Sequence, residues 1–207
     1  MSRTYDDPCG LARALDVVGE RWALLIVREL LLGPKRFTDL RRGLPGASQS
    51  VLTQRLGELE QAGVLRRRAL EPPASTWAYE LTGRGRELEP ALLHLSAWGS
   101  RTPLASNADL SVDALALAMK TTFDPAAAGD LRIRCELRLD GDRLSLVVAG
   151  GRLSLARGGV DDPDAIVDAT AAAFRSAIFG NGDVNVVQGD RRAVSRLLKV
   201  FPRPTPA

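Results

Sequence analysis

The 207-residue chain has few of the residues from which metal and catalytic sites are built. It contains one histidine, His94, and two cysteines, Cys9 and Cys135, that lie far apart in the sequence. One histidine and two distant thiols do not make a zinc site, which needs a full set of clustered ligands. Glycine-rich motifs of the P-loop or dinucleotide-binding kind are also absent. We therefore expect no enzyme activity, no metal and no cofactor.

Long apolar runs are absent as well. The run at residues 23–27 is followed at once by Arg28 and Glu29, and it falls far short of the roughly 20 residues that span a bilayer. The N-terminus does not show the basic-then-apolar order of a secretory signal. We expect a cytoplasmic protein without a membrane partner, whose cysteines are free thiols rather than a disulfide.

Positive charge is concentrated in one part of the chain. The net charge is only +3, yet residues 35–68 hold eight basic and three acidic side chains. Such a concentration is typical of a surface that faces phosphates, although a solvated charged face would look the same.

Hydrophobic periodicity predicts an α+β protein of two domains, with a first domain at 1–100. Helices are expected at 20–32, at 37–42, and from Ser48 or Ser50 to about Gln61, the last with a buried stripe of Leu52, Leu56 and Leu59. Two strands, 64–68 and 77–81, flank a stiff tip at 71–75, and alternation places Trp77, Tyr79 and Leu81 on a half-buried strand face. Thr82 is a suitable cap for a final helix, in which Pro90 should cause a kink or an offset.

This order of helices and hairpin is that of a winged helix-turn-helix. A helix fits the major groove of B-DNA, and its outer face must carry short hydrogen-bonding groups. The face opposite the leucine stripe has such groups, and Gly57 allows the backbone to come close to DNA. The basic residues that flank this helix in the sequence are suited to contact DNA phosphates. The expected DNA-binding residues are Lys35, Arg36, Ser48, Gln49, Ser50, Thr53, Gln54, Arg66, Arg67 and Arg68.

Three segments make the first domain resemble the HxlR family of bacterial regulators. These are Cys9-Gly10 with residues 15–22 and 30–40, then residues 44–60, and then residues 79–85, so that the resemblance covers about residues 8–100. It implies a homodimer joined by terminal helices, with one recognition helix in each half of a two-fold operator in double-stranded DNA. An apolar stripe on the last helix agrees with such pairing. The expected dimerisation residues are Leu88, Leu92, Leu95 and Trp98.

Cys9 allows two interpretations. Some HxlR-type proteins use a cysteine near this position to sense oxidants or electrophiles, which would make Cys9 a redox site. The neighbouring Asp6 and Asp7 argue against this role, because acidic groups raise a thiol pKa. In addition, Gly10 stands where the family often has proline. The alternative is an unreactive thiol packed against the helices.

After a linker at 101–109, the pattern predicts a second domain at 110–203 with a small antiparallel sheet. A helix at 111–123 precedes an alternating strand at 131–139, which continues as a three-stranded meander. Pro163 is expected to start a helix whose buried face holds Ile166, Ala169, Ala173, Phe174 and Ile178. A strand at 184–188 and a last helix through Phe201 follow.

The second domain resembles the sterol carrier protein (type 2) family in its strand at 131–139, its expected helix start at 161–164, and its ending at 184–190 before Val194. The resemblance implies an apolar tunnel between sheet and helices that binds a hydrophobic small molecule. The residues expected to line it are Ile133, Cys135, Leu146, Phe174 and Ile178. The alternative for each of them is an ordinary place in a filled core.

Three functions follow from these patterns. The first is a dimeric DNA-binding transcriptional regulator that responds to a hydrophobic molecule bound by the second domain. The second is a lipid or small-molecule carrier that uses the winged helix mainly to dimerise. The third is a thiol sensor acting through Cys9.

Overall fold

The chain folds into two compact units, Met1–Leu92 and Leu93–Ala207. The computed structural model describes residues 4–70, 76–102 and 108–204. The division falls inside helix α6 (Glu89–Gly99), which therefore begins in the first unit and ends in the second. Most of the linker expected at 101–109 lies in residues 103–107, outside the described residues. The domain limits 1–100 and 110–203 therefore stay a prediction.

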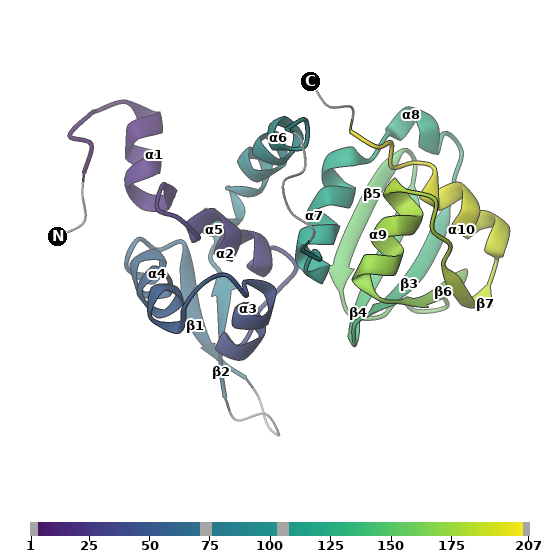
Figure 1. Ribbon diagram of the computed structural model, residues 1–207, viewed down its shortest axis with the longest axis horizontal. Coiled ribbons are helices and arrows are strands. Elements are labelled where there is room, and N and C mark those ends of the chain that lie inside the picture. The colour runs from purple at the N-terminus through teal and green to yellow at the C-terminus, as the bar shows by residue number, and fades with distance from the viewer. Residues whose placement is uncertain (1–3, 71–75, 103–107, 205–207) are drawn as a thin grey trace. The chain divides into compact units, whose positions relative to one another are not determined.

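The body of the first unit is helical, as Figure 1 shows, and consists of α1 (Gly10–Val18), α2 (Ala23–Leu30), α3 (Phe37–Gly43) and α4 (Gln49–Gln61). Side chains of α2 and α4 make much of its core. The leucine stripe of Leu52, Leu56 and Leu59 is buried, as its helical spacing predicts. The opposite face of α4 is thereby left to solvent.

Local backbone chemistry sets the ends of these helices. Trp22 precedes α2 in the left-handed region at φ +79°, so this helix starts later than the expected residue 20. Before α4, the Val51 amide donates a hydrogen bond of 3.3 Å to Ser48 Oγ. Ser48 rather than Ser50 is therefore the cap. Gly63, at φ +70°, follows the end of α4.

The strands β1 (Leu65–Ala69) and β2 (Trp77–Leu81) pair antiparallel, with Arg66 opposite Glu80 and Arg67 opposite Tyr79. The expectation of a half-buried face holds for Tyr79 but was wrong for Trp77. Trp77 is 62% exposed, whereas Ala78 and Glu80 are buried. The small Ala78 is accommodated where α2 packs on β2, and Glu80 is kept inside by arginine partners described below. Leu81 is buried as expected, and the tip at 71–75 lies outside the described residues.

After β2, Thr82 caps the short helix α5 (Gly83–Arg86), because its Oγ1 accepts a 3.2 Å hydrogen bond from the Gly85 amide. The same Oγ1 donates to the carbonyl oxygen of Gly63 at 2.7 Å. The helix stops at Arg86, and α6 begins at Glu89, immediately before Pro90. The expected offset near Pro90 is therefore present.

The second unit is built on a five-stranded sheet in the order β5-β4-β3-β6-β7. Its strands are β3 (Ile133–Leu139), β4 (Asp142–Ala149), β5 (Arg152–Arg157), β6 (Ala165–Ala169) and β7 (Asn185–Gly189). Strands β3 and β6 are parallel, and the other neighbours are antiparallel. The expected meander corresponds to β3, β4 and β5.

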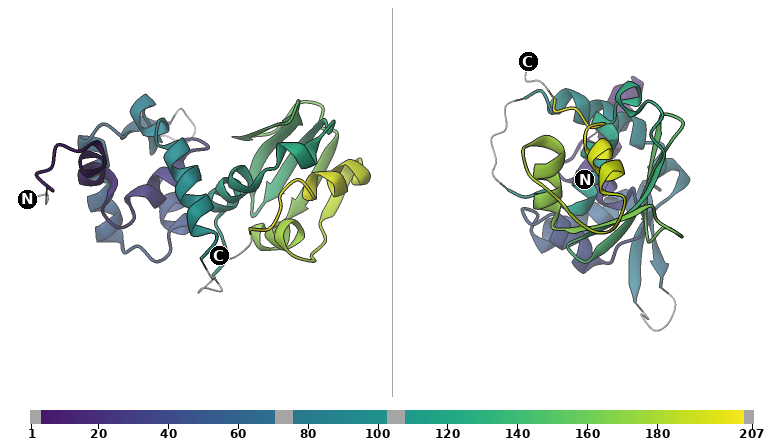
Figure 2. Two further views of the ribbon diagram at one scale, coloured as in Figure 1. Left: turned by 90° about the horizontal axis from the view of Figure 1, so that it is seen from above. Right: turned by 90° about the vertical axis from the view of Figure 1, so that its right-hand side faces the viewer.

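Helices cover one face of this sheet, as Figures 1 and 2 show. They are α7 (Val112–Thr122), α9 (Ala171–Phe179) and α10 (Arg191–Leu198), and the short α8 (Pro125–Ala128) follows α7. Helix α10 packs on β3 and β6, and α7 packs on β5 and α9. Alternate residues of β3, from Ile133 to Leu139, are buried beneath them. One apolar layer between sheet and helices is thus the core of the unit.

The helix expected from Pro163 begins later than predicted. Residues 165–169 form the inner strand β6 instead, and α9 starts at Ala171 after the cap Thr170. Ala165 and Val167 are buried in the sheet, and a short apolar run of this kind does not distinguish a buried strand from a helix. Phe174 and Ile178 are on the buried face of α9 as expected, whereas Ala173 is exposed.

The described residues contain neither a membrane-crossing helix nor a cluster of metal ligands. None of their helices has the length and apolar character needed to cross a membrane. Within the same ranges, no group of three or more histidine, cysteine or acidic residues is arranged to hold a metal ion.

The substitution Gly85→Ala should destabilise the first unit by about 1–3 kcal/mol. The added Cβ would lie 2.1 Å from the carbonyl oxygen of Val64, a backbone atom that is not free to move aside. Gly83→Ala is the matched control, because its Cβ would meet nothing within 4 Å on the same helix. Alanine at this control position should stabilise by roughly 0.5–1 kcal/mol. Urea unfolding measures both, and equal stabilities of the two variants would contradict the packing of α5 on Val64.

Candidate nucleic-acid interface

The exposed face of α4 carries short polar side chains. Gln49, Ser50, Thr53 and Gln54 are exposed, on the side opposite the buried leucines. Ser48 is engaged in the cap, and its Oγ lies 3.1 Å from Ser50 Oγ. Gln54 Nε2 donates to Glu58 Oε1 at 2.9 Å. Because α4 is fixed by its leucines, the sequence-predicted polar residues form one continuous surface.

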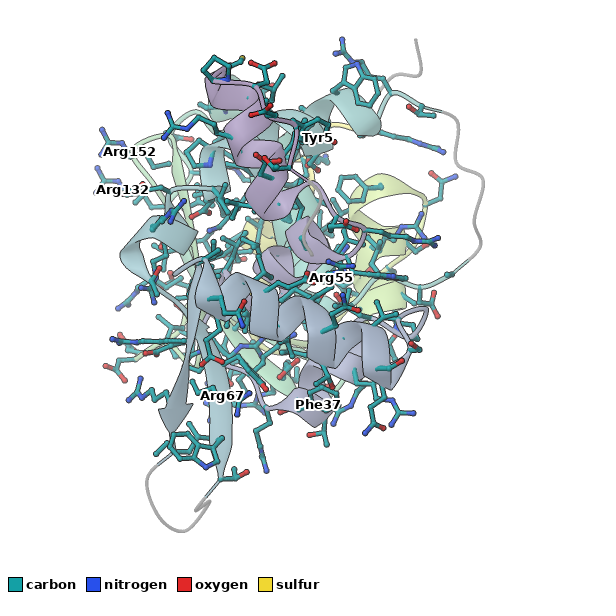
Figure 3. All side chains as sticks on the ribbon, turned by 90° about the vertical axis from the view of Figure 1, so that its left-hand side faces the viewer. Tyr5, Phe37, Arg55, Arg67, Arg132 and Arg152 are labelled. Atoms are coloured by element: carbon teal, nitrogen blue, oxygen red, sulfur yellow. The ribbon has the colours of Figure 1, made fainter. Side chains whose placement is uncertain are left out.

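Arg55 has a different role from the other polar residues of α4. Its side chain is largely buried, lies 3.3 Å from Glu20, and pairs with Glu58. Figure 3 shows Arg55 on α4 and Arg67 on the hairpin. Arg55 therefore ties α4 to the turn between α1 and α2. Sequence reasoning did not assign this role, because Glu20 lies more than thirty positions away.

Two of the hairpin arginines are held by one buried carboxylate. Arg66 Nε donates to Glu80 Oε1 at 2.7 Å, and Arg68 donates to Glu80 Oε2 at 3.3 Å. Burial of Glu80 raises its pKa, but the hydrogen bonds and positive charges of Arg66 and Arg68 outweigh that effect, so that the net pKa lies below its usual value. Glu80 is thus ionised at neutral pH and orients two guanidinium groups that remain more than half exposed.

Arg67 extends from the other side of β1. Its guanidinium lies 5.6 Å from the centre of the Tyr79 ring and 3.3 Å from Glu60 of α4. A cation over an aromatic face is attracted to it, which limits the directions the side chain takes. All three predicted hairpin arginines are therefore oriented by neighbours while their charges stay accessible to solvent.

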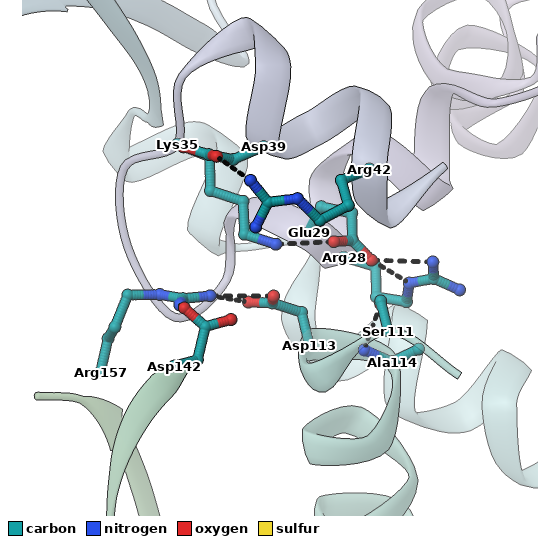
Figure 4. A network of polar contacts seen from close by, with 10 residues as sticks. All are labelled: Arg28, Glu29, Lys35, Asp39, Arg42, Ser111, Asp113, Ala114, Asp142 and Arg157. Atoms are coloured by element: carbon teal, nitrogen blue, oxygen red, sulfur yellow. Dashed lines mark hydrogen bonds and ion pairs between the residues drawn. The ribbon is translucent and has the colours of Figure 1, made fainter. Parts of the chain in front are cut away.

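Lys35 does not belong to this accessible set, contrary to the expectation from the sequence. Its side chain is only 9% exposed, and its Nζ donates to Glu29 Oε2 at 2.7 Å. Arg28 contacts the same carboxylate at 2.8 Å, and Figure 4 shows these contacts around Glu29. A buried carboxylate requires paired cations, and this requirement keeps Lys35 inside.

Arg36 differs from its neighbour Lys35. It precedes α3, its side chain is 55% exposed, and its Nε is 3.6 Å from Asp39. Arg42 at the other end of α3 is 3.2 Å from the same aspartate. These surface pairs are weak, so both guanidinium groups remain available to another anion.

The predicted dimerisation stripe changes in burial along its length. Leu92 is buried and Leu88 is half-buried, whereas Leu95 and Trp98 are exposed at 50% and 67%. His94 is exposed on the same helix. In the first unit, Leu11 and Leu15 of α1 are exposed as well. Apolar side chains that are left in solvent along a helix face are typical of a surface that another chain covers.

Cys9 is an exposed free thiol directly before α1. Hydrogen bonds from the backbone of Leu11 and Ala12 lower its pKa, outweighing the slight effect of burial. The argument from Asp6 and Asp7 is therefore wrong, because backbone amides at the helix start dominate. The alternative of a thiol packed against the helices is contradicted by the exposure of Cys9.

The five side chains expected to line a tunnel in the second unit are all buried in its core. Ile133, Cys135, Leu146 and Phe174 are at most 1% exposed, and Ile178 is also buried. Burial raises the pKa of Cys135 to about 12, with smaller contributions from Asp164 and Glu136, so this thiol stays protonated. A pocket of about 570 Å³ lies elsewhere, on the helical side of the same unit, and none of the five residues lines it.

Comparisons with known proteins concern the first half of the chain. A family model described as HxlR-like helix-turn-helix matches residues 17–106. The uncharacterized HTH-type transcriptional regulator YdeP of Bacillus subtilis (strain 168) is 37% identical over 93 residues, which are 45% of this chain and 73% of YdeP. YvaP, another uncharacterized HTH-type transcriptional regulator of that strain, is 39% identical over 88 residues, 42% of this chain and 82% of YvaP. A solved structure of the redox regulator HypR in its oxidized form is 34% identical, covers 47% of this chain and 100% of its own, and has a TM-score of 0.44.

The substitution Glu80→Gln should destabilise the first unit by about 1–3 kcal/mol at pH 7, because it removes the charge that pairs with Arg66 and Arg68. The folded-state pKa of Glu80 lies below its unfolded value, which is about 4.3. The stabilising contribution is therefore complete above that pH and is lost as the pH falls through the lowered folded-state pKa.

Urea unfolding at pH 7 and at about pH 3 measures this effect. The gap between the wild-type chain and Glu80→Gln should be smaller at the lower pH. Glu87→Gln, at an exposed position after α5, is the control and should change stability little at either pH. A gap that is the same at both pH values would contradict the ion-pair role of Glu80.

Proposed function

Because the chain belongs to the HxlR family of helix-turn-helix proteins, we propose that it is a transcriptional regulator that binds a two-fold operator in double-stranded DNA as a homodimer. The relatives compared above are transcriptional regulators, and the chain is a DNA-binding regulator of this type and not an enzyme. The observation that carries the proposal is the exposed polar face of α4 next to the arginines of the hairpin.

Helix α4 reads the bases in this proposal. Thr53 and Gln54 are exposed in its first half, where a recognition helix contacts base edges. A glutamine side chain matches the donor and acceptor of adenine in the major groove, and a threonine methyl suits thymine. Ser50 and Gln49 extend the same surface, and Ser48 acts through the cap that starts the helix.

The hairpin holds the DNA backbone in this proposal. Arg66, Arg67 and Arg68 present positive charge that Glu80, Glu60 and Tyr79 orient but do not bury. Arg36 adds an exposed charge before α3. Contacts of this kind fix the register of a protein on the duplex without reading its sequence.

A second copy of the chain is the proposed partner for the exposed apolar side chains of α6. Leu95 and Trp98 continue the stripe of Leu88 and Leu92, and they are 50% and 67% exposed. Pairing of two copies through these residues would place two recognition helices at the two halves of one operator.

The second unit is the proposed sensor domain. Helices cover one face of its sheet, which supports a sterol-carrier-like domain as part of this proposal, although β3 and β6 are parallel where the sequence predicts an antiparallel sheet. A pocket on its helical side supports binding of a small molecule. A ligand alters DNA affinity only if it binds the two DNA-binding states differently.

Two kinds of variant should separate base reading from backbone binding. Gln54→Ala should weaken binding to the operator by about 1–3 kcal/mol and leave binding to a scrambled duplex unchanged. Replacing Arg66, Arg67 and Arg68 together by alanine should weaken binding to both duplexes and reduce the slope of log affinity against log salt by about 2–3. Fluorescence anisotropy with DNA upstream of the protein's own gene, at two salt concentrations, measures both effects.

The control is Gln61→Ala at the other end of α4, which should bind the operator like the wild-type chain. The complex should contain two chains per duplex. A wild-type chain that binds operator and scrambled DNA equally, with no effect of the arginine replacements, would reject DNA recognition and favour a carrier function.

A thiol switch through Cys9 is a second candidate function, because its thiol is exposed and its pKa is lowered. A lowered pKa increases the thiolate fraction at neutral pH, and the thiolate is the form that oxidants attack. Cys135 provides an internal comparison, since its thiol is buried.

Iodoacetamide at pH 7 should modify Cys9 and leave Cys135 intact in the folded chain, which peptide mass spectrometry measures. If Cys9 is a switch, hydrogen peroxide should lower operator affinity of the wild-type chain by about tenfold or more and leave Cys9→Ser unchanged. Full loss of DNA binding by oxidised Cys9→Ser would dispose of the thiol switch.

A further inference from the structure

The pocket of about 570 Å³ in the second unit is formed by helices and by the end of the chain, not by the sheet. Ala118 and Thr121 of α7, Ala172 and Phe179 of α9, and the residues before the described C-terminal end contribute to its wall. Another side is lined by Ser96 and Gly99 of α6 and by Ser100 directly after it. Its volume is within the usual range of small-molecule sites.

Two arginines, Arg175 of α9 and Arg203 near the end of the chain, also line this pocket. Arg175 is half-buried, and Arg203 is exposed. Over the described ranges 4–70, 76–102 and 108–204, neither guanidinium group lies within salt-bridge distance of an acidic side chain.

The other arginines with restricted exposure in this unit do have acidic partners. Arg157 is held by Asp113 at 2.7 Å and by Asp142 at 2.7 Å, and Arg138 lies 2.8 Å from Glu136. A partly buried charge usually has a partner, because removal from water is costly. Arg175 therefore stands out as a half-buried cation whose counter-charge does not come from the described part of the chain.

Three hydroxyl groups that line the pocket already donate to backbone carbonyls. The hydroxyl groups of Thr121 and Thr122 donate to the carbonyl oxygens of Leu117 and Ala118, at 2.7 and 2.8 Å. Ser100 Oγ donates to the carbonyl oxygen of Ala97 at 2.9 Å. The two guanidinium groups are the charged donors among the residues that line the pocket.

We infer that this pocket binds an organic anion with an apolar body, whose carboxylate or similar group pairs with Arg175 and Arg203. A guanidinium group matches the two oxygens of a carboxylate in a bidentate pair. Phe179 and the alanines of α7 and α9 supply an apolar wall for the rest of the ligand. A regulatory role for this ligand rests on the proposed function, but binding of the anion to the pocket does not require DNA.

Calorimetric titration of the full chain with decanoate, and with the uncharged decanol, tests this assignment. Decanoate should bind one site per chain, and Arg175→Met with Arg203→Met should weaken its binding by about ten- to hundredfold while leaving decanol binding within about twofold. Arg192→Met, at an exposed position of α10 outside the pocket, is the charge-matched control and should leave decanoate binding unchanged.

A pair of alanine substitutions tests the location. Ala172→Leu adds bulk to the pocket wall and should weaken binding of both compounds, whereas Ala173→Leu, at the exposed next position of α9, should not. Circular dichroism and urea unfolding check that each variant is folded. Decanoate binding that is unchanged by the loss of both arginines, or unchanged by Ala172→Leu in a folded chain, would overturn the inference, as would no binding to the wild-type chain.

The operator-binding assay described above separates a failure of the anion-binding inference from a failure of the proposed function. A chain that binds its operator and not decanoate remains a regulator without this site. A chain that binds decanoate through Arg175 and not DNA has the site but not the proposed function.

Discussion

The first unit is organised around one buried charge, the carboxylate of Glu29. It is inaccessible to solvent, and it contacts Lys35 at 2.7 Å and Arg28 at 2.8 Å. An unpaired carboxylate at such a position would cost several kcal/mol, so the chain is constrained to bring cations to it. A Cβ at Gly43 would lie 2.1 Å from Glu29 Oε2, so the end of α3 must approach without a side chain. One carboxylate thus sets the positions of α2, α3 and the segment between them.

The hairpin depends on the same pair through the backbone of Lys35. The Lys35 amide donates to the Tyr79 carbonyl oxygen at 3.0 Å, and the Tyr79 amide donates in return at 2.8 Å. Lys35 therefore serves the fold with both its side chain and its backbone. Glu80, next to Tyr79, is also a buried carboxylate paired with cations. Its partners Arg66 and Arg68 are oriented by it but remain exposed at the surface. The difference between an inner and an outer ion pair thus decides which basic side chains stay exposed to solvent.

The sequence predicts well those features that local chemistry determines. The leucine spacing of α4, the caps Ser48 and Thr82, and the alternation of β3 depend on neighbours within one element, and the structure has all of them. Lys35 was misjudged because its burial depends on Glu29 and Gly43, which periodicity does not connect. Strand β6 was missed because its apolar run fits either a helix or an inner parallel strand, and only the pairing with β3 selects the strand.

Most charged side chains that are buried or half-buried in the second unit have a partner of opposite charge. Glu136 is buried on the sheet face opposite the helices, between Arg138 and Arg143, and hydrogen bonds from these arginines keep its pKa below the usual value. Asp113 and Arg157 likewise satisfy each other where α7 meets β5. Among the described residues Arg175 has no acidic partner of this kind. Its position in a pocket was not predictable, because the residues that line the pocket follow no sequence period.

Helix α6 is the element through which an occupant of that pocket would act on DNA binding. Its first turns contribute Leu92 to the core of the first unit, and its last turns, from Ser96 to Gly99, line the pocket of the second. The same helix carries Leu95 and Trp98, the proposed contacts of a second chain. A ligand that touches one side of a helix alters pairing on another side only if it favours one of two arrangements of that helix. On the proposed function, coupling between ligand and operator would therefore depend on α6, and its size would equal the difference in ligand affinity between those arrangements.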